Sequence, residues 1–301
     1  MRSASNRVRR ARPSLGTFVE ITAGGDSEAR LHSAIDRAFA AVARVDRQMS
    51  FHHPASDISR INREAFQRKL TVDPWTWRVL RAAQKLSHES DGLFDITVAR
   101  KLMQWNYLPR RYRNVSEGTW RSIVLEKNCT VRFRQRVIID LGGIAKGFAV
   151  DRAVEALKRA GVPSGVVNAG GDLRVFGLKS ELVHLRPPDE PMQPASAIKL
   201  RERALATSGI YFTQKRCDRA VVSPLLDGRT CQSSRKLMSV SVAASACMIA
   251  DALTKIVFIL QEKSRPLLAR YHADTLLLER HGAPLWMFRS SCGTRDRTQF
   301  D

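Results

Sequence analysis

The sequence predicts a mixed α+β fold, because segments with helical spacing alternate along the chain with short runs typical of strands. Its 301 residues are enough for one large domain or two interlocked subdomains around a sizeable core. Apolar residues make up 44% and charged residues 26%, which excludes a fibrous or wholly disordered protein. We expect a basic N-terminal tail over residues 1–12, one main domain over 13–287 and a polar C-terminal tail over 288–301.

Two helices in the N-terminal third carry start signals. Ser27 can cap the first, whose apolar residues recur at three- and four-residue steps from Leu31 to Val45. Asp73 and Pro74 start the second, because proline is favoured at the first helical position. Strands are expected at residues 18–22, 137–140, 165–168, 173–176 and 239–242.

A double glycine at Gly142 and Gly143 separates the run 137–140 from a helix that begins at Ala145 and ends at Gly161. This turn and the helix N-terminus would direct backbone N–H groups and a positive dipole end to one point, which suits a phosphate. The segment matches neither the GxGxxG nor the P-loop pattern. An anion site and a simple packing turn therefore both stay open.

Polar residues in three further segments also allow two interpretations each. Small residues in the turn 168–172 permit close approach by a ligand or by a neighbouring strand. Asp95 could accept hydrogen bonds from a ligand or cap the chain that follows it. Asp251 shares a helix face with Thr254 and Lys255, so a carboxylate and a hydroxyl could reach one hard cation. The alternative is an aspartate in the first helical turn that suits the helix dipole.

The chain is strongly basic, with a formal net charge of +21, which predicts attraction to anions. Its arginines lie in small scattered clusters and no nucleic-acid-binding module is recognisable, so we do not expect a nucleic-acid partner. The five cysteines include no CxxC pair, which argues against a disulfide framework or a thiolate metal site. We find no signal peptide and no apolar stretch of about 20 residues, so we expect a cytoplasmic protein without a membrane span.

Taken in order, these segments resemble the ApbE-type flavin transferases, which are FAD:protein FMN transferases. The resemblance covers residues from about 12 to 285, and its matching stretches are Leu15-Gly16-Thr17, Met49-Ser50, Ser56-Asp57-Ile58-Ser59-Arg60-Ile61-Asn62, Asp91-Gly92-Leu93-Phe94-Asp95-Ile96-Thr97-Val98 with Trp105, Asp140-Leu141-Gly142-Gly143-Ile144-Ala145-Lys146-Gly147, Val167-Asn168-Ala169-Gly170-Gly171-Asp172-Leu173, Ala206-Thr207-Ser208-Gly209 and Ala250-Asp251-Ala252-Leu253. It implies mixed sheets with packed helices in two interlocked subdomains, with FAD in the cleft between them. It also implies Mg²⁺-dependent transfer of FMN from FAD to a threonine of a partner flavoprotein, with release of AMP.

The resemblance assigns site residues position by position. The positions that match FAD-binding residues are Leu15, His52, Leu93, Phe94, Asp95, Asp140, Lys146 and Val222. The positions that match metal ligands are Gly143 through its carbonyl, Asp251, Thr254 and Lys255. We therefore expect the double glycine and Asp251 to lie side by side, where amides and a divalent ion would hold the diphosphate of FAD.

Two departures from the family pattern bear on activity. Lys255 stands where the family usually has a threonine, so Thr254 could replace that ligand, or the ammonium could replace Mg²⁺ as the countercharge. Ala220 stands where the family has a histidine thought to act as the base, and Asp218 is a candidate to replace it. The catalytic residue therefore stays unassigned. Three hypotheses follow: an active transferase, a relative that binds or hydrolyses FAD without modifying a protein, and a basic scaffold for nucleic acid or an acidic partner.

Overall fold

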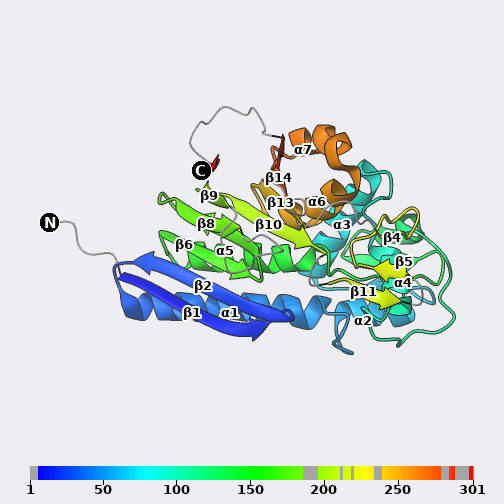
Figure 1. Ribbon diagram of the computed structural model, residues 1–301. Coiled ribbons are helices and arrows are strands. Elements are labelled where there is room, and N and C mark those ends of the chain that lie inside the picture. The colour runs from blue at the N-terminus through cyan, green and yellow to red at the C-terminus, as the bar shows by residue number, and fades with distance from the viewer. Residues whose placement is uncertain are drawn as a thin grey trace.

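The computed structural model describes residues 6–185, 196–210, 213–217, 220–233, 239–278, 285–288 and 298–300, and within these ranges its largest sheet has eight antiparallel strands (Figure 1). In spatial order the strands are β1 (Asn6–Ser14), β2 (Thr17–Gly25), β6 (Ser164–Ala169), β7 (Asp172–Phe176), β10 (Ala204–Gly209), β13 (Ser239–Ala244), β14 (Asp274–Leu278) and β15 (Leu285–Phe288). The predicted α+β class is confirmed.

Three helices cover one face of this sheet: α1 (Glu28–Met49), α5 (Ala145–Arg159) and α6 (Cys247–Leu260). Figure 1 shows α1 running along β1 and β2, with α5 between it and α6. Ser27 caps α1 as predicted, since its hydroxyl accepts a hydrogen bond from the Arg30 amide. The apolar stripe from Leu31 to Val45 is buried against α5 and the sheet, so the predicted core face is confirmed.

The opposite face of the sheet is covered by a smaller sheet of β8 (Glu181–Leu185), β9 (Ser196–Leu200) and β16 (Thr298–Phe300). A separate apolar cluster fills the space between the two sheets, where Val175 of β7 and Leu205 of β10 pack with Ile198 and Leu200 of β9. The molecule is thus layered as helices, main sheet and small sheet.

A second group of elements gathers at one end of α1 (Figure 1). It contains α2 (Asp57–Glu64), β3 (Leu70–Thr71), α3 (Pro74–Glu89), η1 (Ile96–Val98), α4 (Ala99–Gln104), η2 (Trp120–Ser122), β4 (Ile123–Glu126) and β5 (Thr130–Phe133). The remaining elements are β11 (Lys215–Cys217), β12 (Ala220–Val222), η3 (Gln261–Ser264) and α7 (Arg265–Arg270). Asp73 caps α3 and Pro74 occupies its first turn, as the sequence predicts.

Residues 137–140 do not form the strand that we predicted. The segment is extended and its apolar residues are buried, but its neighbour is a side chain rather than a strand. The Asn62 amide donates to the Ile139 carbonyl at 2.9 Å and accepts from the Ile139 amide at 2.8 Å. Because one asparagine satisfies both backbone groups, no ladder partner is needed there.

Residues 6–12, which we expected in a basic tail, are part of strand β1. Val8 points into the core, while the arginines around it meet carboxylates of β2 and α1. Arg12, for example, lies 2.7 Å from Asp36 and 4.6 Å from the centre of the Phe39 ring. The C-terminal tail expected from residue 288 contains β16, which pairs with β9.

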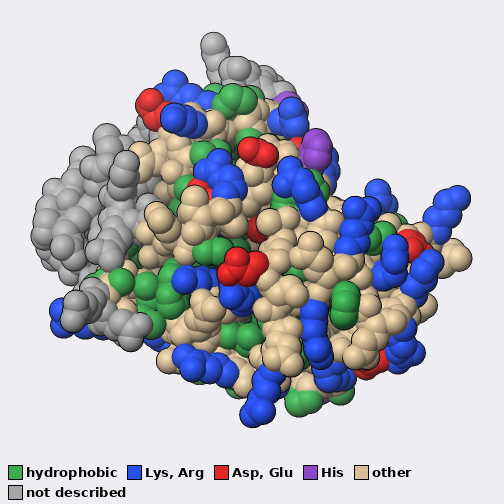
Figure 2. Space-filling view, turned by 90° about the vertical axis from the view of Figure 1, so that its right-hand side faces the viewer, with side chains coloured by type: hydrophobic (Ala, Val, Ile, Leu, Met, Phe, Trp, Pro, Cys, Tyr) green, Lys and Arg blue, Asp and Glu red, His purple; other side chains and the backbone are tan. Residues whose placement is uncertain are grey.

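Lys and Arg side chains are distributed over the face of the molecule seen in Figure 2, rather than gathered into one patch. Several of the N-terminal arginines are paired with acidic side chains, so their charges are balanced locally although the net charge of the chain is unchanged. In the part of the chain that is described, no helix is both long and apolar enough to cross a membrane.

Candidate functional site

Two cavities meet at the double-glycine turn and form one cleft. The first chamber has a volume of about 630 Å³ and the second of about 400 Å³. Both are lined by Leu108, Asp140, Gly142 and Lys146, so these residues form the junction between them. A cleft with two chambers and a polar junction suits a ligand with two bulky ends joined by an anionic bridge.

The positions assigned to FAD are distributed over this cleft. Leu15 and His52 line the first chamber, while Leu93, Phe94 and Asp95 line the second. Asp140 and Lys146 belong to the junction. Val222 lines neither chamber: it is buried in β12, and its carbonyl accepts a hydrogen bond from Tyr107, which does line the second chamber.

Asp95 acts as a cap in this structure. One carboxylate oxygen accepts hydrogen bonds from the amide and the hydroxyl of Thr97, both at 2.8 Å, and the other accepts from the Trp120 amide at 2.9 Å. Burial raises the pKa of this carboxyl, against those hydrogen bonds. Of the two roles that the sequence left open for Asp95, the structure therefore shows capping.

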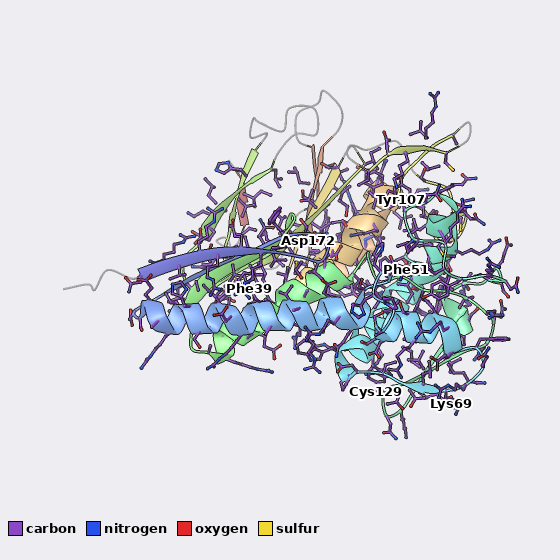
Figure 3. The ribbon with its side chains drawn as sticks, turned by 90° about the horizontal axis from the view of Figure 1, so that it is seen from below. Phe39, Phe51, Lys69, Tyr107, Cys129 and Asp172 are labelled. Atoms are coloured by element: carbon purple, nitrogen blue, oxygen red, sulfur yellow. The ribbon has the colours of Figure 1, made fainter. Side chains whose placement is uncertain are left out.

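A cluster of four ionisable side chains lies beside the junction: Lys146 of α5, Asp172 of β7, and Asp251 and Lys255 of α6. We call it the buried charge cluster. Lys146 is paired with Asp172, and Lys255 with Asp251. The Asp172 side chain is 1% exposed and that of Asp251 is 0% exposed. Figure 3 shows Asp172 near the place where α5 and α6 meet.

The pKa values of the two acids in the buried charge cluster are shifted in opposite directions. Burial raises the pKa of Asp172, and the nearby charge of Asp251 raises it further. Burial acts on Asp251 in the same sense, but Lys255 and Lys146 outweigh it and lower the pKa of Asp251. The pKa of Lys146 is raised, because Asp172 and Asp251 outweigh the opposing effect of its burial. With all four groups ionised, the cluster is electrically neutral.

Asp251 joins α6 to the first turn of α5. One of its carboxylate oxygens accepts a hydrogen bond from the Gly147 amide at 3.1 Å. A Cβ atom added to Gly143 would lie 3.6 Å from Cε of Lys255. The double-glycine turn and Asp251 therefore lie side by side, as we expected. Because α6 begins at Cys247, Asp251 lies beyond its first turn, and the alternative of a first-turn aspartate is wrong.

The positions assigned to a metal come together but do not fit a divalent ion as they are arranged. The second carboxylate oxygen of Asp251 contacts the Lys255 ammonium. The Asp251 carbonyl accepts from the Thr254 hydroxyl at 2.6 Å and from the Lys255 ammonium at 2.9 Å. Mg²⁺ requires free oxygen ligands in near-octahedral geometry, and here a cationic side chain takes them. Within the described ranges, no three His, Cys, Asp or Glu side chains are grouped to hold a metal.

The amides that we expected around a phosphate are partly used by the protein itself. The Gly142 amide donates to the Asp140 carboxylate at 3.0 Å, and the Gly147 amide donates to Asp251. Those of Ile144 and Ala145 both donate to the Leu141 carbonyl. The Lys146 side chain and the positive end of α5 remain as the groups that attract an anion at the junction.

One part of the site, at Ala220, departs from the family pattern, and another, at Tyr107, was not predicted from the sequence. Ala220 is exposed on β12 and its methyl group cannot accept a proton; Asp218 lies outside the described residues. The Tyr107 hydroxyl contacts the carbonyls of Thr213, at 2.5 Å, and Val222. It thereby ties the chain after α4 to the β11–β12 hairpin. A lone tyrosine gave no signal in the sequence, whereas Asp172 stood at the end of a glycine turn.

Comparisons with known proteins agree with this geometry. The chain matches the model of the ApbE family over residues 15–277. An FAD:protein FMN transferase of Vibrio cholerae is 26% identical over 273 residues, which cover 83% of this chain and 80% of that protein. One of Rhodobacter capsulatus is 28% identical over 272 residues, 84% of this chain but 51% of that protein, so the chain spans about half of its length. The crystal structure of the ApbE protein of Thermotoga maritima superposes with a TM-score of 0.83 at 27% identity, covering 95% of this chain and 97% of that one.

Proposed function

The chain belongs to the ApbE family, and from that premise we propose that it is an FAD:protein FMN transferase. The observation that carries the proposal is the cleft of two chambers that meet at Asp140, Gly142 and Lys146. FAD has the matching form, because its flavin and adenosine ends are joined by a diphosphate. We assign the diphosphate to the junction, where the Lys146 ammonium and the N-terminus of α5 attract negative charge.

The reaction at the junction is a phosphoryl-centred substitution. The hydroxyl oxygen of a threonine on a partner flavoprotein attacks the phosphorus of the FMN half. A new oxygen–phosphorus bond forms, the bond from that phosphorus to the bridging oxygen breaks, and AMP leaves with the electron pair. Lys146 contributes by holding the phosphate oxygens as their charge shifts, which is the main way that proteins accelerate this chemistry.

Each chamber would hold one end of FAD. We assign Leu15 and His52 to contacts in the first chamber, and Leu93 and Phe94 to contacts in the second. These side chains supply apolar and aromatic surface, which is what a planar ring system requires. Asp95 and Val222 act less directly: Asp95 holds the loop that carries Phe94, and Val222 fixes the Tyr107 hydroxyl through its carbonyl.

The attacking hydroxyl must lose a proton, and Ala220 cannot take it. Asp140 is the carboxylate at the junction, beside the position that we assign to the diphosphate. Burial raises its pKa, which makes it a better proton acceptor than an ordinary aspartate. We therefore assign proton acceptance to Asp140, in the place of the family histidine.

The alanine at position 220 also favours a second candidate function. If no group accepts the proton of a protein hydroxyl, the cleft can still bind FAD, and water can replace the acceptor to give FMN and AMP. Such a protein would bind or hydrolyse FAD without modifying a partner.

The test combines the purified chain with FAD and a flavoprotein domain that carries the acceptor threonine. Mass spectrometry measures the covalent FMN on the acceptor, and chromatography measures the AMP released. An acceptor with alanine in place of that threonine is the control. Covalent FMN on the acceptor with threonine, and none on the acceptor with alanine, supports the transferase. AMP release without covalent FMN on either acceptor supports hydrolysis. Absence of FAD binding contradicts both.

A further inference from the structure

The Lys255 ammonium lies where a metal ligand set would meet its ion. It contacts a carboxylate oxygen of Asp251 and, at 2.9 Å, the carbonyl oxygen of the same residue. Hard cations in proteins are bound by this pair of donors, a carboxylate and a backbone carbonyl. Lys255 is four residues after Asp251 on α6, so both groups come from one rigid turn of helix.

The position of Lys255 is built into the wall of the cleft. Its side chain is 19% exposed and lines the second chamber together with Gly143 and Ser208. The Cε atom lies 3.6 Å from the point where a Cβ of Gly143 would be, so the side chain passes directly beside the double-glycine turn. Thr254 is fully buried, and its hydroxyl is already engaged with the Ser208 hydroxyl at 2.7 Å and with the Asp251 carbonyl at 2.6 Å.

We propose that Lys255 is a tethered cation that takes the place of a divalent metal ion in this chain. This inference rests on the proposed function, because it names how the same cleft holds the diphosphate of FAD. Lys146 and Lys255 then approach the diphosphate from α5 and α6, each with its own aspartate behind it. The cation is part of the chain, so no free ion has to be bound before FAD.

Two consequences follow. Binding of FAD no longer depends on the concentration of divalent ions, because the ammonium is always present. A single positive charge also replaces two, so the electrostatic stabilisation of the phosphate oxygens is smaller than a metal ion would supply. We therefore expect FMN transfer to be slower than in a metal-dependent transferase and insensitive to chelators.

The experiment measures FAD affinity by the quenching of flavin fluorescence, in EDTA and in excess MgCl₂. Wild-type protein is expected to give the same affinity in both buffers, within about twofold. Lys255→Met removes the charge and keeps most of the length, so affinity should fall roughly tenfold or more in both buffers, as for loss of a charge-assisted hydrogen bond. Lys255→Thr should bind weakly in EDTA and recover in MgCl₂, because its hydroxyl adds an oxygen ligand to the freed Asp251 oxygens, which methionine cannot supply.

Lys69→Met is the matched control. Lys69 is an exposed lysine paired with Glu126, and Figure 3 shows it at a distance from Asp172. Its replacement should leave FAD affinity unchanged in both buffers. Thermal unfolding of every variant checks that the fold is retained. If a Lys255 variant does not fold, the comparison of wild-type protein in EDTA and MgCl₂ decides the matter alone.

The outcomes separate this inference from the proposed function when FMN transfer is measured in the same samples. FAD binding or transfer by wild-type protein that requires Mg²⁺ overturns the tethered cation and leaves the transferase intact. FAD binding in EDTA without any transfer overturns the transferase and supports the tethered cation. If FAD affinity depends on Mg²⁺ equally in Lys255→Thr and in wild-type protein, the tethered cation is also overturned.

Discussion

Gly147→Ala is expected to destabilise the protein, although alanine forms helices better than glycine does. A Cβ atom at this position would lie 2.3 Å from the Cys247 carbonyl oxygen and 2.8 Å from the Met248 amide nitrogen. Ordinary contacts of a Cβ atom are 3.4–4 Å, so the atom would be about 1 Å too close. Both neighbours are backbone atoms of α6 and cannot rotate away. The start of α6 must therefore move relative to α5.

The expected magnitude follows from three contributions. Replacing glycine by alanine gains about 1 kcal/mol in a helix interior, and at most that much at Gly147, which lies in the first turn of α5. Overpacking of a dense contact typically costs about 1–3 kcal/mol. Moving α6 also weakens the hydrogen bond from the Gly147 amide to the Asp251 carboxylate, and a bond to a charged group contributes about 1.5–3 kcal/mol. The free energy of unfolding should fall by about 2 kcal/mol, and FAD affinity should fall with it.

Chemical denaturation measures this change through the shift of the unfolding midpoint. Arg159→Ala serves as the control, because it also introduces alanine into α5, at a side chain that is 74% exposed. It should change the free energy of unfolding by less than about 0.5 kcal/mol. A Gly147→Ala protein as stable as wild type, or more stable, would refute the account of the contact between α5 and α6.

Further predictions concern the groups that position the cleft. Asp151→Ala should lower the free energy of unfolding by about 3 kcal/mol, because its carboxylate accepts from the first two amides of α6 and pairs with Arg174; a denaturation shift under about 1 kcal/mol speaks against this. Asn62→Ala should cost about 2 kcal/mol by the same assay, since both backbone groups of Ile139 lose their partner. Asp140→Asn should slow FMN transfer at least about tenfold, by more than it changes FAD affinity, as expected for a lost base; a loss of affinity as large as the loss of rate contradicts that role.

The sequence predicted those parts of the fold that depend on local signals. The caps at Ser27 and Asp73 mark the starts of α1 and α3, and their apolar spacing identifies the buried faces. The prediction of a strand at residues 137–140 was wrong, because a buried apolar run has the same sequence pattern whether its backbone is hydrogen-bonded to a strand or to a side chain. The partner, Asn62, lies 77 residues earlier, and no local pattern connects the two.

The candidate site likewise contains features that the sequence predicted and features that depend on tertiary packing. The order of the motifs identified the double-glycine turn and Asp251 as neighbours, which the structure bears out. The pairing of Lys146 with Asp172 joins a helix to a strand and depends on tertiary packing. The Tyr107 contacts depend on the path of the chain after α4 in the same way. The cytoplasmic location stays a prediction.

The carboxylate of Asp151 holds the beginning of a helix that lies almost a hundred residues further along the chain. Since α6 takes its cap from α5 rather than from its own preceding loop, this contact adds to the strands of the main sheet in holding the two helices together. The intervening residues also carry four strands of the main sheet and Asp172, so the spacing between the two lysines is held both by this cap and by the sheet on which the helices pack.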